Sequence, residues 1–305
     1  MMLTSSLALA TAWAPTTIPS SQRSLLLRRP RPSSRLLVTA ATSTTTTLDD
    51  GRRYSVFKDD AAVADYICAE VAAMAGAAIA EKGAFSLSIG SGTTVKPLER
   101  LKEQDPTIDF SCVHVFFGNE RTAGEAAGKC LNGAQAWLKA CGVPAENVHS
   151  PPFGEDPEAS AQQYSELLLG MAENVVARTT RGGKVMGNGM VTGGTEMPVL
   201  DLCLLGSGAD GHTASLYPGS KQVLASYEGV KVVVPADKKG GVTFTVDMIS
   251  CAGRVMLSAG KAEQAAMVAM GLREGGTKMG LPAGMISGNQ VEWLLTEASA
   301  GELGS

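Results

Sequence analysis

Apolar residues along this chain gather in short runs that alternate with longer stretches of helical spacing. Short runs bounded by glycine, proline or polar residues are typical of buried strands. They predict strands at 85–90, 112–118, 200–206, 230–235 and 254–259. Stretches with helix start and stop signals predict helices at 59–82, 95–103, 133–141, 157–178, 261–272 and 290–300. This alternation indicates an α/β fold in which helices cover both faces of a mainly parallel sheet.

Residues 179–198 are rich in glycine and show no sustained apolar period. Such a stretch predicts a surface loop between a helix and the buried strand that follows it. A lid and a tolerated insertion both fit this composition, because lengthening a loop costs little entropy. We assign the segment no role.

The first 47 residues differ in composition from the rest of the chain. They hold five arginines, no lysine and no acidic residue, and they are crowded with serine and threonine. Leaders of this kind are typical of organelle transit peptides, and the alternative is a disordered tail that carries no targeting signal. We therefore expect a disordered transit peptide at 1–47 and one α/β domain at 48–305. The composition favours a plastid over a mitochondrion.

The charge of the remaining chain narrows the choice of partners. Taking the five leader arginines from 26 basic residues leaves 21 against 30 acidic ones, a net charge of −9. This balance disfavours nucleic-acid binding. No run reaches the roughly 18 apolar residues of a membrane helix, so we expect a soluble protein that does not bind membranes, and a monomer.

Six cysteines are spread without a CxxC pair, and only three histidines occur. The cysteines look like buried, reduced thiols, and the spacing gives no support to a zinc site. We predict no metal and no cofactor.

The run from Leu200 to Gly219, LDLCLLGSGADGHTASLYPG, carries the most chemistry. Its apolar first part predicts a buried parallel strand, and the glycine-rich turn that follows places Asp210 and His212 at the strand's carboxyl end. Ligands bind at that edge in open α/β sheets, and an imidazole there is suited to proton transfer at neutral pH. We expect His212 to be a general base and Asp210 to orient it. Backbone N–H groups of the turn from Gly206 to Gly211, or of the loop at Gly92, would stabilise the oxyanion of an ester hydrolysis. We count Gly208 among the substrate-binding residues.

Two other strand ends carry candidate anion-binding residues. The loop Gly90, Ser91, Gly92, Thr93 and Thr94 precedes a predicted helix, where N–H groups and hydroxyls can cradle a phosphate. An ordinary turn between strand and helix is the alternative from the loop alone. Arg121 follows the next strand and can bind phosphate in two parallel hydrogen bonds, unless it pairs with a surface glutamate.

These motifs resemble those of the 6-phosphogluconolactonases, in the superfamily that also holds the glucosamine-6-phosphate deaminases. GADGHTASLYPG is close to the family's histidine signature, and its ending follows the lactonase pattern. SLSIGSGTTVKPLER and VHVFFGNER resemble the family's phosphate loop and second strand, and VEWLLTEASAGEL resembles its C-terminal helix. The likeness spans about residues 60–300. It implies a Rossmann-like fold and hydrolysis of 6-phospho-D-glucono-1,5-lactone to 6-phosphogluconate in the oxidative pentose phosphate pathway.

Within this resemblance the chain departs from the family pattern at several positions. Asn119 stands where the family usually has Asp, and the segment after Arg121 lacks a Ser-Asn pair. Lys238 or Lys239 would supply positive charge to the phosphate where Gly241 replaces an arginine. Two alternatives stay open: a non-catalytic sugar-phosphate-binding paralogue, and an amino-sugar-phosphate isomerase or deaminase.

Overall fold

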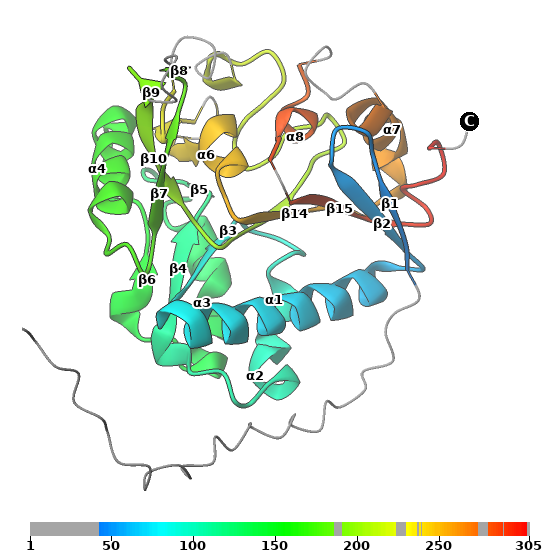
Figure 1. Cartoon of the computed structure of the whole chain (residues 1–305), viewed down its shortest axis with the longest axis horizontal. Coiled ribbons are helices and arrows are strands. Elements are labelled where there is room, and N and C mark those ends of the chain that lie inside the picture. Colours follow the sequence, from blue (N-terminus) through cyan, green and yellow to red (C-terminus); the bar gives the residue numbers. More distant parts are fainter. Residues whose placement is uncertain are drawn as a thin grey trace, which may run out of the picture. The chain divides into compact units, whose positions relative to one another are not determined.

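The computed structural model is built on an eight-stranded sheet with the strand order β1-β2-β15-β14-β11-β3-β4-β6 (Figure 1). The structure describes residues 43–185, 191–223, 230–236, 238, 240–273, 280–288 and 290–303, all within one compact unit. The strands, in that order, are β1 (Thr44–Thr47), β2 (Arg53–Phe57), β15 (Val291–Thr296), β14 (Arg254–Ala259), β11 (Leu202–Gly206), β3 (Phe85–Ile89), β4 (Val113–Phe117) and β6 (Val148–His149).

Neighbouring strands of this sheet run parallel except at the β1–β2 edge, which is antiparallel. The predicted mainly parallel sheet is therefore confirmed. Side chains alternate between the two faces: Leu202 and Leu204 belong to one apolar core, and Cys203 and Leu205 to the other. Burial on both faces explains why the strands look like continuous apolar runs in the sequence.

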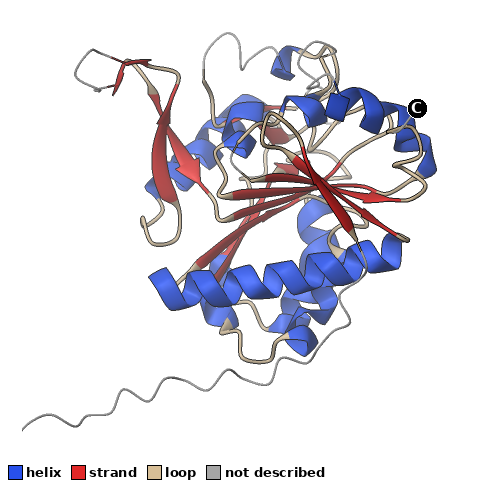
Figure 2. Ribbon diagram, turned by 45° about the vertical axis from the view of Figure 1, so that its right-hand side comes forward, coloured by secondary structure: helices blue, strands red, loops and turns tan. Residues whose placement is uncertain are grey.

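Helices cover both faces of the sheet (Figure 2). The side chains of α1, α2 and α3 enter one core, and those of α4, α6, α7 and α8 enter or pack against the other. The α-helices are α1 (Asp60–Lys82), α2 (Leu101–Gln104), α3 (Lys129–Cys141), α4 (Pro157–Gly170), α6 (Val246–Ser250), α7 (Ala265–Arg273) and α8 (Pro282–Met285); the short 3-10 helices are η1 (Lys96–Arg100), η2 (Phe110–Cys112), η3 (Ala145–Asn147) and η4 (Ala262–Gln264).

Helix α1 begins and ends where its sequence signals place it. The Asp59 side chain accepts a hydrogen bond from the Ala62 N–H, and Gly83 ends the helix in the left-handed region with φ 79°. By length and composition α1 could cross a membrane. Its buried residues, such as Ile67 and Val71, pack in the core on one face of the sheet.

Three smaller sheets accompany the large one in the part of the chain that the structure describes. β12 (Val233–Pro235), β13 (Val242–Phe244) and β5 (Asn119–Glu120) form an antiparallel sheet. β7 (Ala177–Arg181) pairs with β10 (Thr195–Val199), and β8 (Lys184–Val185) with β9 (Val191–Thr192). The prediction of a loop at 179–198 was therefore wrong for its described residues, and 186–190 lie outside them. Glycines at 182, 183, 193 and 194 hid the strand pattern of the hairpin.

Other predicted elements need correction. Residues 290–300 were expected to be a helix, but Val291–Thr296 form β15, a strand whose six residues are all buried. A short run buried on every side has no amphipathic period, so strand and helix cannot be told apart by pattern. The helix expected at 157–178 ends at Gly170. The expected domain start at 48 is too late, because Thr44–Thr47 pair with β2; residues 1–42 lie outside the described part.

The chain connections mark one place along the carboxyl ends of the strands, between β3 and β11. β3 and β11 are parallel neighbours, but from β3 the chain proceeds to β4 and β6, whereas from β11 it proceeds to β14 and β15 on the other side. Connections that leave two adjacent strands in opposite directions open a crevice at their carboxyl ends. The predicted phosphate loop and the predicted histidine loop follow β3 and β11, so they meet at this crevice.

A pair of histidines joins β4 to the edge strand β6. His114 Nδ1 and His149 Nε2 lie 3.1 Å apart, and the rings are nearly parallel. Burial, with a smaller contribution from His114, lowers the pKa of His149 to about 4, and burial together with Lys82 lowers that of His114. The pair therefore contributes to the packing between β4 and β6.

We predict that this pair makes the fold sensitive to mild acid. Below about pH 6.5 these histidines are protonated in the unfolded chain but stay neutral in the folded one. The free energy of unfolding therefore falls as the pH drops towards 4. Urea unfolding at about pH 7 and about pH 5 checks this for the wild type and for His149→Phe, which keeps a ring against Phe116. The variant should lose less stability between the two pH values, and equal losses would contradict the prediction.

Candidate active site

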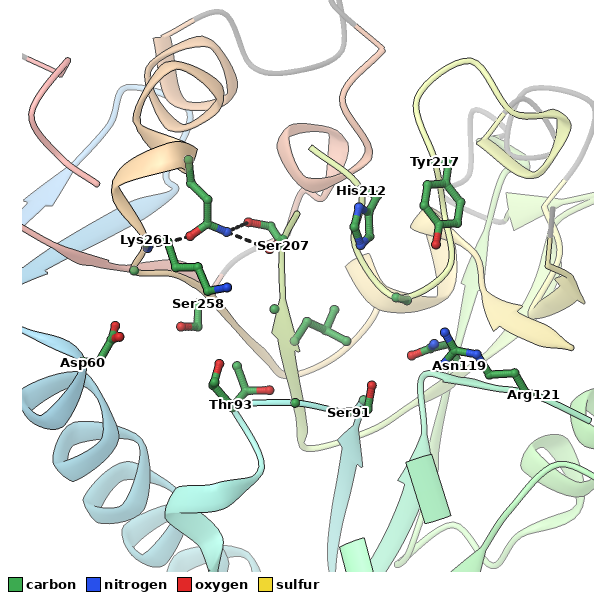
Figure 3. A pocket seen from close by; sticks show the side chains of 18 residues that line it. Asp60, Ser91, Thr93, Asn119, Arg121, Ser207, His212, Tyr217, Ser258 and Lys261 are labelled. Carbon is green, nitrogen blue, oxygen red and sulfur yellow. Dashed lines mark hydrogen bonds between the residues drawn. The ribbon is translucent and has the colours of Figure 1, made fainter. Parts of the chain in front are cut away.

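A cavity of about 420 Å³ opens at the crevice between β3 and β11. Its walls come from the loop after β3, from Asn119 and Arg121, from the loop after β11 and from residues that follow β14. Figure 3 shows His212 and Tyr217 on one side, Lys261 and Ser258 on the other, and Thr93 and Ser91 between them. The structure thus brings together three of the segments in which the sequence analysis placed site residues.

His212 lies at the cavity wall with its side chain about one-third exposed. Its Nδ1 atom is 2.5 Å from Oδ1 of Asp210, and the same oxygen accepts the His212 backbone N–H. Partial burial alone would raise the pKa of Asp210, but these two hydrogen bonds lower it below its ordinary value. The ionised carboxylate keeps the proton on Nδ1, so Nε2 is left free to accept another.

Two glycines allow this arrangement. A side chain at Gly208 would place its Cβ 2.2 Å from the His212 ring and 2.6 Å from Asp210 Oδ1. Gly211 has φ 83°, and its carbonyl accepts the Ala283 N–H. Gly208 therefore lies behind the imidazole, and its N–H is bonded to the His212 carbonyl at 2.8 Å. The glycine backs the histidine, and its expected role in substrate contact stays a prediction.

The loop after β3 presents its backbone to the cavity. None of the N–H groups from Ser91 to Thr94 has an acceptor among the described residues, and both these residues and Gly90 line the cavity. Thr94 is 4% exposed, and its hydroxyl is buried without a partner. Several unpaired donors beside the start of η1 make a place for an anion.

Asn119, Glu120 and Arg121, which follow β4, have three different roles. Glu120 is buried and accepts the N–H groups of Arg121, Cys130 and Leu131, which fixes the start of α3. The Arg121 side chain forms no ion pair with any described residue and lines the cavity. The surface pairing considered for Arg121 is thus absent, and its guanidinium is available to a ligand. Asn119 is buried and donates to Ser215 Oγ at 2.9 Å.

Lys238, the described lysine of the pair 238 and 239, contacts a wall residue of the cavity without lining the cavity itself. Lys238 Nζ sits over the ring of Tyr217, 4.2 Å from its centroid, and Lys238 is not among the lining residues. Tyr217 in turn packs on His212, with ring centroids 4.8 Å apart. Lys239 lies outside the described residues. Gly241 lets β13 approach β5 closely, because a Cβ there would be 2.1 Å from the Glu120 carbonyl oxygen.

Sequence reasoning missed the wall that follows β14. Lys261, Gln264 and Ser258 line the cavity together with Asp60 from the start of α1. Gln264 donates to the Ser207 carbonyl at 2.7 Å and accepts the Lys261 N–H at 2.7 Å, which joins this wall to the loop after β11. The signal was present, because Lys261 directly follows a predicted strand and starts a predicted helix. Lys261 is thus a second cation of the cavity wall, on the side opposite Arg121.

Within the described part of the chain, no three histidine, cysteine or acidic side chains come together as metal ligands would. The absence of a metal therefore stays a prediction.

Comparisons with known proteins agree with this geometry. The family of glucosamine-6-phosphate isomerases/6-phosphogluconolactonase matches residues 58–295. A 6-phosphogluconolactonase of Nostoc sp. is 29% identical over 231 residues, which cover 74% of this chain and 88% of the relative. The chloroplastic 6-phosphogluconolactonase 3 of Arabidopsis thaliana is 27% identical over 230 residues, which cover 73% of this chain and 66% of the relative. The crystal structure of 6-phosphogluconolactonase from Leishmania guyanensis has a TM-score of 0.64 at 22% identity and covers 81% of this chain and 97% of its own, which shows the shared fold.

We predict that Gly208→Ala displaces the imidazole of His212. The new methyl group would overlap the ring and the Asp210 carboxylate, so the loop must shift, at a cost of roughly 1–3 kcal/mol in the free energy of unfolding. Imidazole ¹H–¹⁵N spectra and thermal unfolding measure the two effects. Gly76→Ala is the matched control, since its Cβ meets nothing within 4 Å and it lies within α1. Unchanged His212 signals in Gly208→Ala would contradict the prediction.

Proposed function

The chain belongs to the family of glucosamine-6-phosphate isomerases and 6-phosphogluconolactonases, and we propose that within it this protein hydrolyses 6-phospho-D-glucono-1,5-lactone to 6-phosphogluconate. One observation carries the proposal. An imidazole whose Nδ1 is held by a carboxylate faces the same cavity as a loop of unpaired backbone N–H groups. A general base and an anion cradle in one cavity are what hydrolysis of a phosphorylated sugar ester requires.

His212 starts the reaction as a general base. Its Nε2 removes a proton from a water molecule while the water oxygen attacks C1 of the lactone. Asp210 holds the ring in place through Nδ1 and stabilises the imidazolium that forms. The imidazolium then returns its proton to the ring oxygen as the C1–O5 bond breaks. The chemistry proceeds on the chain's own residues, without a cofactor.

The phosphate group binds over the loop Gly90–Thr94. Its oxygens accept the unpaired N–H groups of that loop, and Lys261 and Arg121 balance its charge from opposite ends of the cavity. Anchoring the far end of the substrate fixes the lactone carbonyl beside His212. Lys238 supports Tyr217, a residue of the cavity wall, by lying over its ring, and it does not itself line the cavity.

Two alternatives are distinguished by simple measurements. An amino-sugar-phosphate isomerase or deaminase would release ammonia from glucosamine 6-phosphate, whereas the sequence after His212 favours the lactonase branch. A non-catalytic paralogue would be stabilised by 6-phosphogluconate without turning over the lactone. Asn119 does not by itself favour the paralogue, because its amide donates to Ser215 and supports the histidine loop.

The proposed setting is the plastid stroma, in the oxidative pentose phosphate pathway. The arginine-rich, acid-free leader fits a transit peptide, and chloroplastic relatives occur among the similar proteins. Since β1 starts at Thr44, the folded domain of the mature protein would need the chain from about that residue.

We predict that His212→Ala lowers kcat for the lactone by about 10²- to 10⁴-fold, because the water loses its base. Lactone disappearance is followed against the spontaneous background, with the full chain. His114→Gln, a change far from the cavity, is the control and should keep its activity. Equal rates for the wild type and His212→Ala would remove the catalytic role of this histidine.

We predict that Lys261→Met and Arg121→Ala each raise KM for the phosphorylated lactone by about tenfold or more and leave unphosphorylated glucono-1,5-lactone unaffected. A charge that binds the phosphate equally in ground and transition states changes KM and not kcat. Steady-state kinetics with both lactones checks this. The control is Lys102→Met, an exposed lysine on α2. A cation whose loss leaves both KM values unchanged does not bind the phosphate.

A further inference from the structure

The hydrogen bond to Asp210 aims the imidazole of His212 but does not by itself hold it still. The Asp210 side chain is 55% exposed and that of His212 is 34% exposed. The χ2 torsion of a histidine is broad, so the ring and the carboxylate can swing together with their hydrogen bond intact. A general base has to meet one water molecule at one angle, and a small displacement of such a group lowers the rate. The imidazole therefore needs a second contact.

Tyr217 supplies a second contact for the imidazole. Its ring packs on the ring of His212 with the centroids 4.8 Å apart and the two planes 31° from parallel. Both residues line the cavity, and Figure 3 shows their side chains next to each other. Aromatic rings at such a distance attract one another beyond the area that they bury. The tyrosine ring therefore limits how far the imidazole can swing.

Tyr217 can hold a neighbour because its own backbone is fixed on both sides. On the side of His212, the Leu216 N–H donates to the Thr213 carbonyl at 2.9 Å, and Leu216 is 0% exposed. On the other side, Tyr217–Ser220 form a type II turn, in which the N–H of the last residue donates to the Tyr217 carbonyl at 3.1 Å and Gly219 has φ 72°. The second residue of this turn is a proline, which also restricts the backbone of the tyrosine before it.

Lys238 contacts the tyrosine ring from a different segment of the chain. Its Nζ lies over the ring, 4.2 Å from the centroid, within the range of a cation–π interaction. Lys238 follows β12, whereas Tyr217 belongs to the loop after β11. Since Lys238 is not among the residues that line the cavity, its ammonium group restrains the ring from outside the cavity.

We infer that Tyr217 is a positioning residue for the general base, and for its effect on turnover this inference rests on the proposed function. The tyrosine ring keeps the imidazole at the angle at which Nε2 meets the attacking water, and Lys238 keeps the tyrosine ring in place. The contact is made by the ring, so the Tyr217 hydroxyl is not required. Loss of the ring should lower kcat and leave KM nearly unchanged, because the phosphate is bound elsewhere, over the loop Gly90–Thr94.

The test removes the whole ring in one variant and only the hydroxyl in another, in the full chain. In Tyr217→Leu we expect kcat for the lactone to fall about 10- to 100-fold with KM within about threefold of the wild type. Tyr217→Phe is the conservative variant that keeps the ring, so it should restore kcat to within about threefold of the wild type. The matched control is Phe153→Leu, which removes an exposed aromatic ring that does not line the cavity.

Imidazole ¹H–¹⁵N spectra follow the ring of His212 directly and need no turnover. The chain has three histidines, and His114 and His149 lie on β4 and β6, where they serve as internal controls. We expect the His212 signals to shift in Tyr217→Leu and to stay near their wild-type positions in Tyr217→Phe. The signals of the other two histidines should not change in either variant.

Lys238→Met tests the second contact of the tyrosine ring. Because Lys238 acts through the ring, its loss should lower kcat by about two- to fivefold in the wild type and have no further effect in Tyr217→Leu. KM should stay unchanged, whereas a lysine that binds the phosphate would raise KM. Lys238→Arg should retain the wild-type kcat, since a guanidinium also binds over an aromatic ring.

Four outcomes would overturn the inference. Wild-type kcat in Tyr217→Leu would show that the ring is not needed, and an equal loss in Tyr217→Phe would assign the effect to the hydroxyl. A rise of KM at unchanged kcat in Tyr217→Leu would make the ring a substrate contact. Unchanged His212 signals in Tyr217→Leu would show that the ring does not position the imidazole.

Two further measurements separate the inference from folding and from the proposed function. Calorimetric binding of 6-phosphogluconate shows that each variant is folded. If Tyr217→Leu does not fold, Lys238→Met, a change at an exposed residue, decides the matter, and wild-type kcat in it would overturn the inference. No turnover by the wild type would overturn the proposed function, and the His212 spectra would then decide whether Tyr217 positions the imidazole.

Discussion

The hydrogen bond between Asp210 and the His212 imidazole is the interaction on which the site depends. It fixes both the direction of the ring and the nitrogen that carries the proton. Gly208 leaves room for both groups, and the loop lies at the crevice because the connections after β3 and β11 run in opposite directions across the sheet. A histidine at the end of another strand would not face the crevice between β3 and β11. Without Gly208 the imidazole of His212 would have no room beside Asp210.

The loop around this histidine is fixed from three separate segments of the chain. Asn119 follows β4, Thr243 lies on β13, and the Gly206 carbonyl ends β11, yet all three bond to the turn after His212. The small β12-β13-β5 sheet positions two of them, and Gly241 permits its close packing. Asn119 therefore has a structural role that does not need the negative charge of an aspartate.

The sequence allowed prediction of the elements whose patterns are local. The strands at β3, β4, β11 and β14 and the helix α1 lie close to their expected places, since Gly and capping residues mark their ends. It did not allow prediction of β15, because complete burial removes the period that separates strand from helix. The sequence placed His212 and the loop after β3 at strand ends, and both line the cavity. Lys261 was missed as a cavity-lining residue, and Lys238 contacts Tyr217 without lining the cavity itself, because which lysine faces the cavity depends on tertiary packing.

Two positions in one loop use small residues for opposite physical reasons. At 208 any side chain would overlap the imidazole, so glycine is required by space. At 214 glycine would relieve the strain of φ 51°, yet the chain carries alanine. A glycine there would gain access to other conformations, and the turn would lose part of its fixed geometry. Alanine restricts the turn to fewer conformations, and the buried contacts of Thr213 and Ser215 hold it in the strained one.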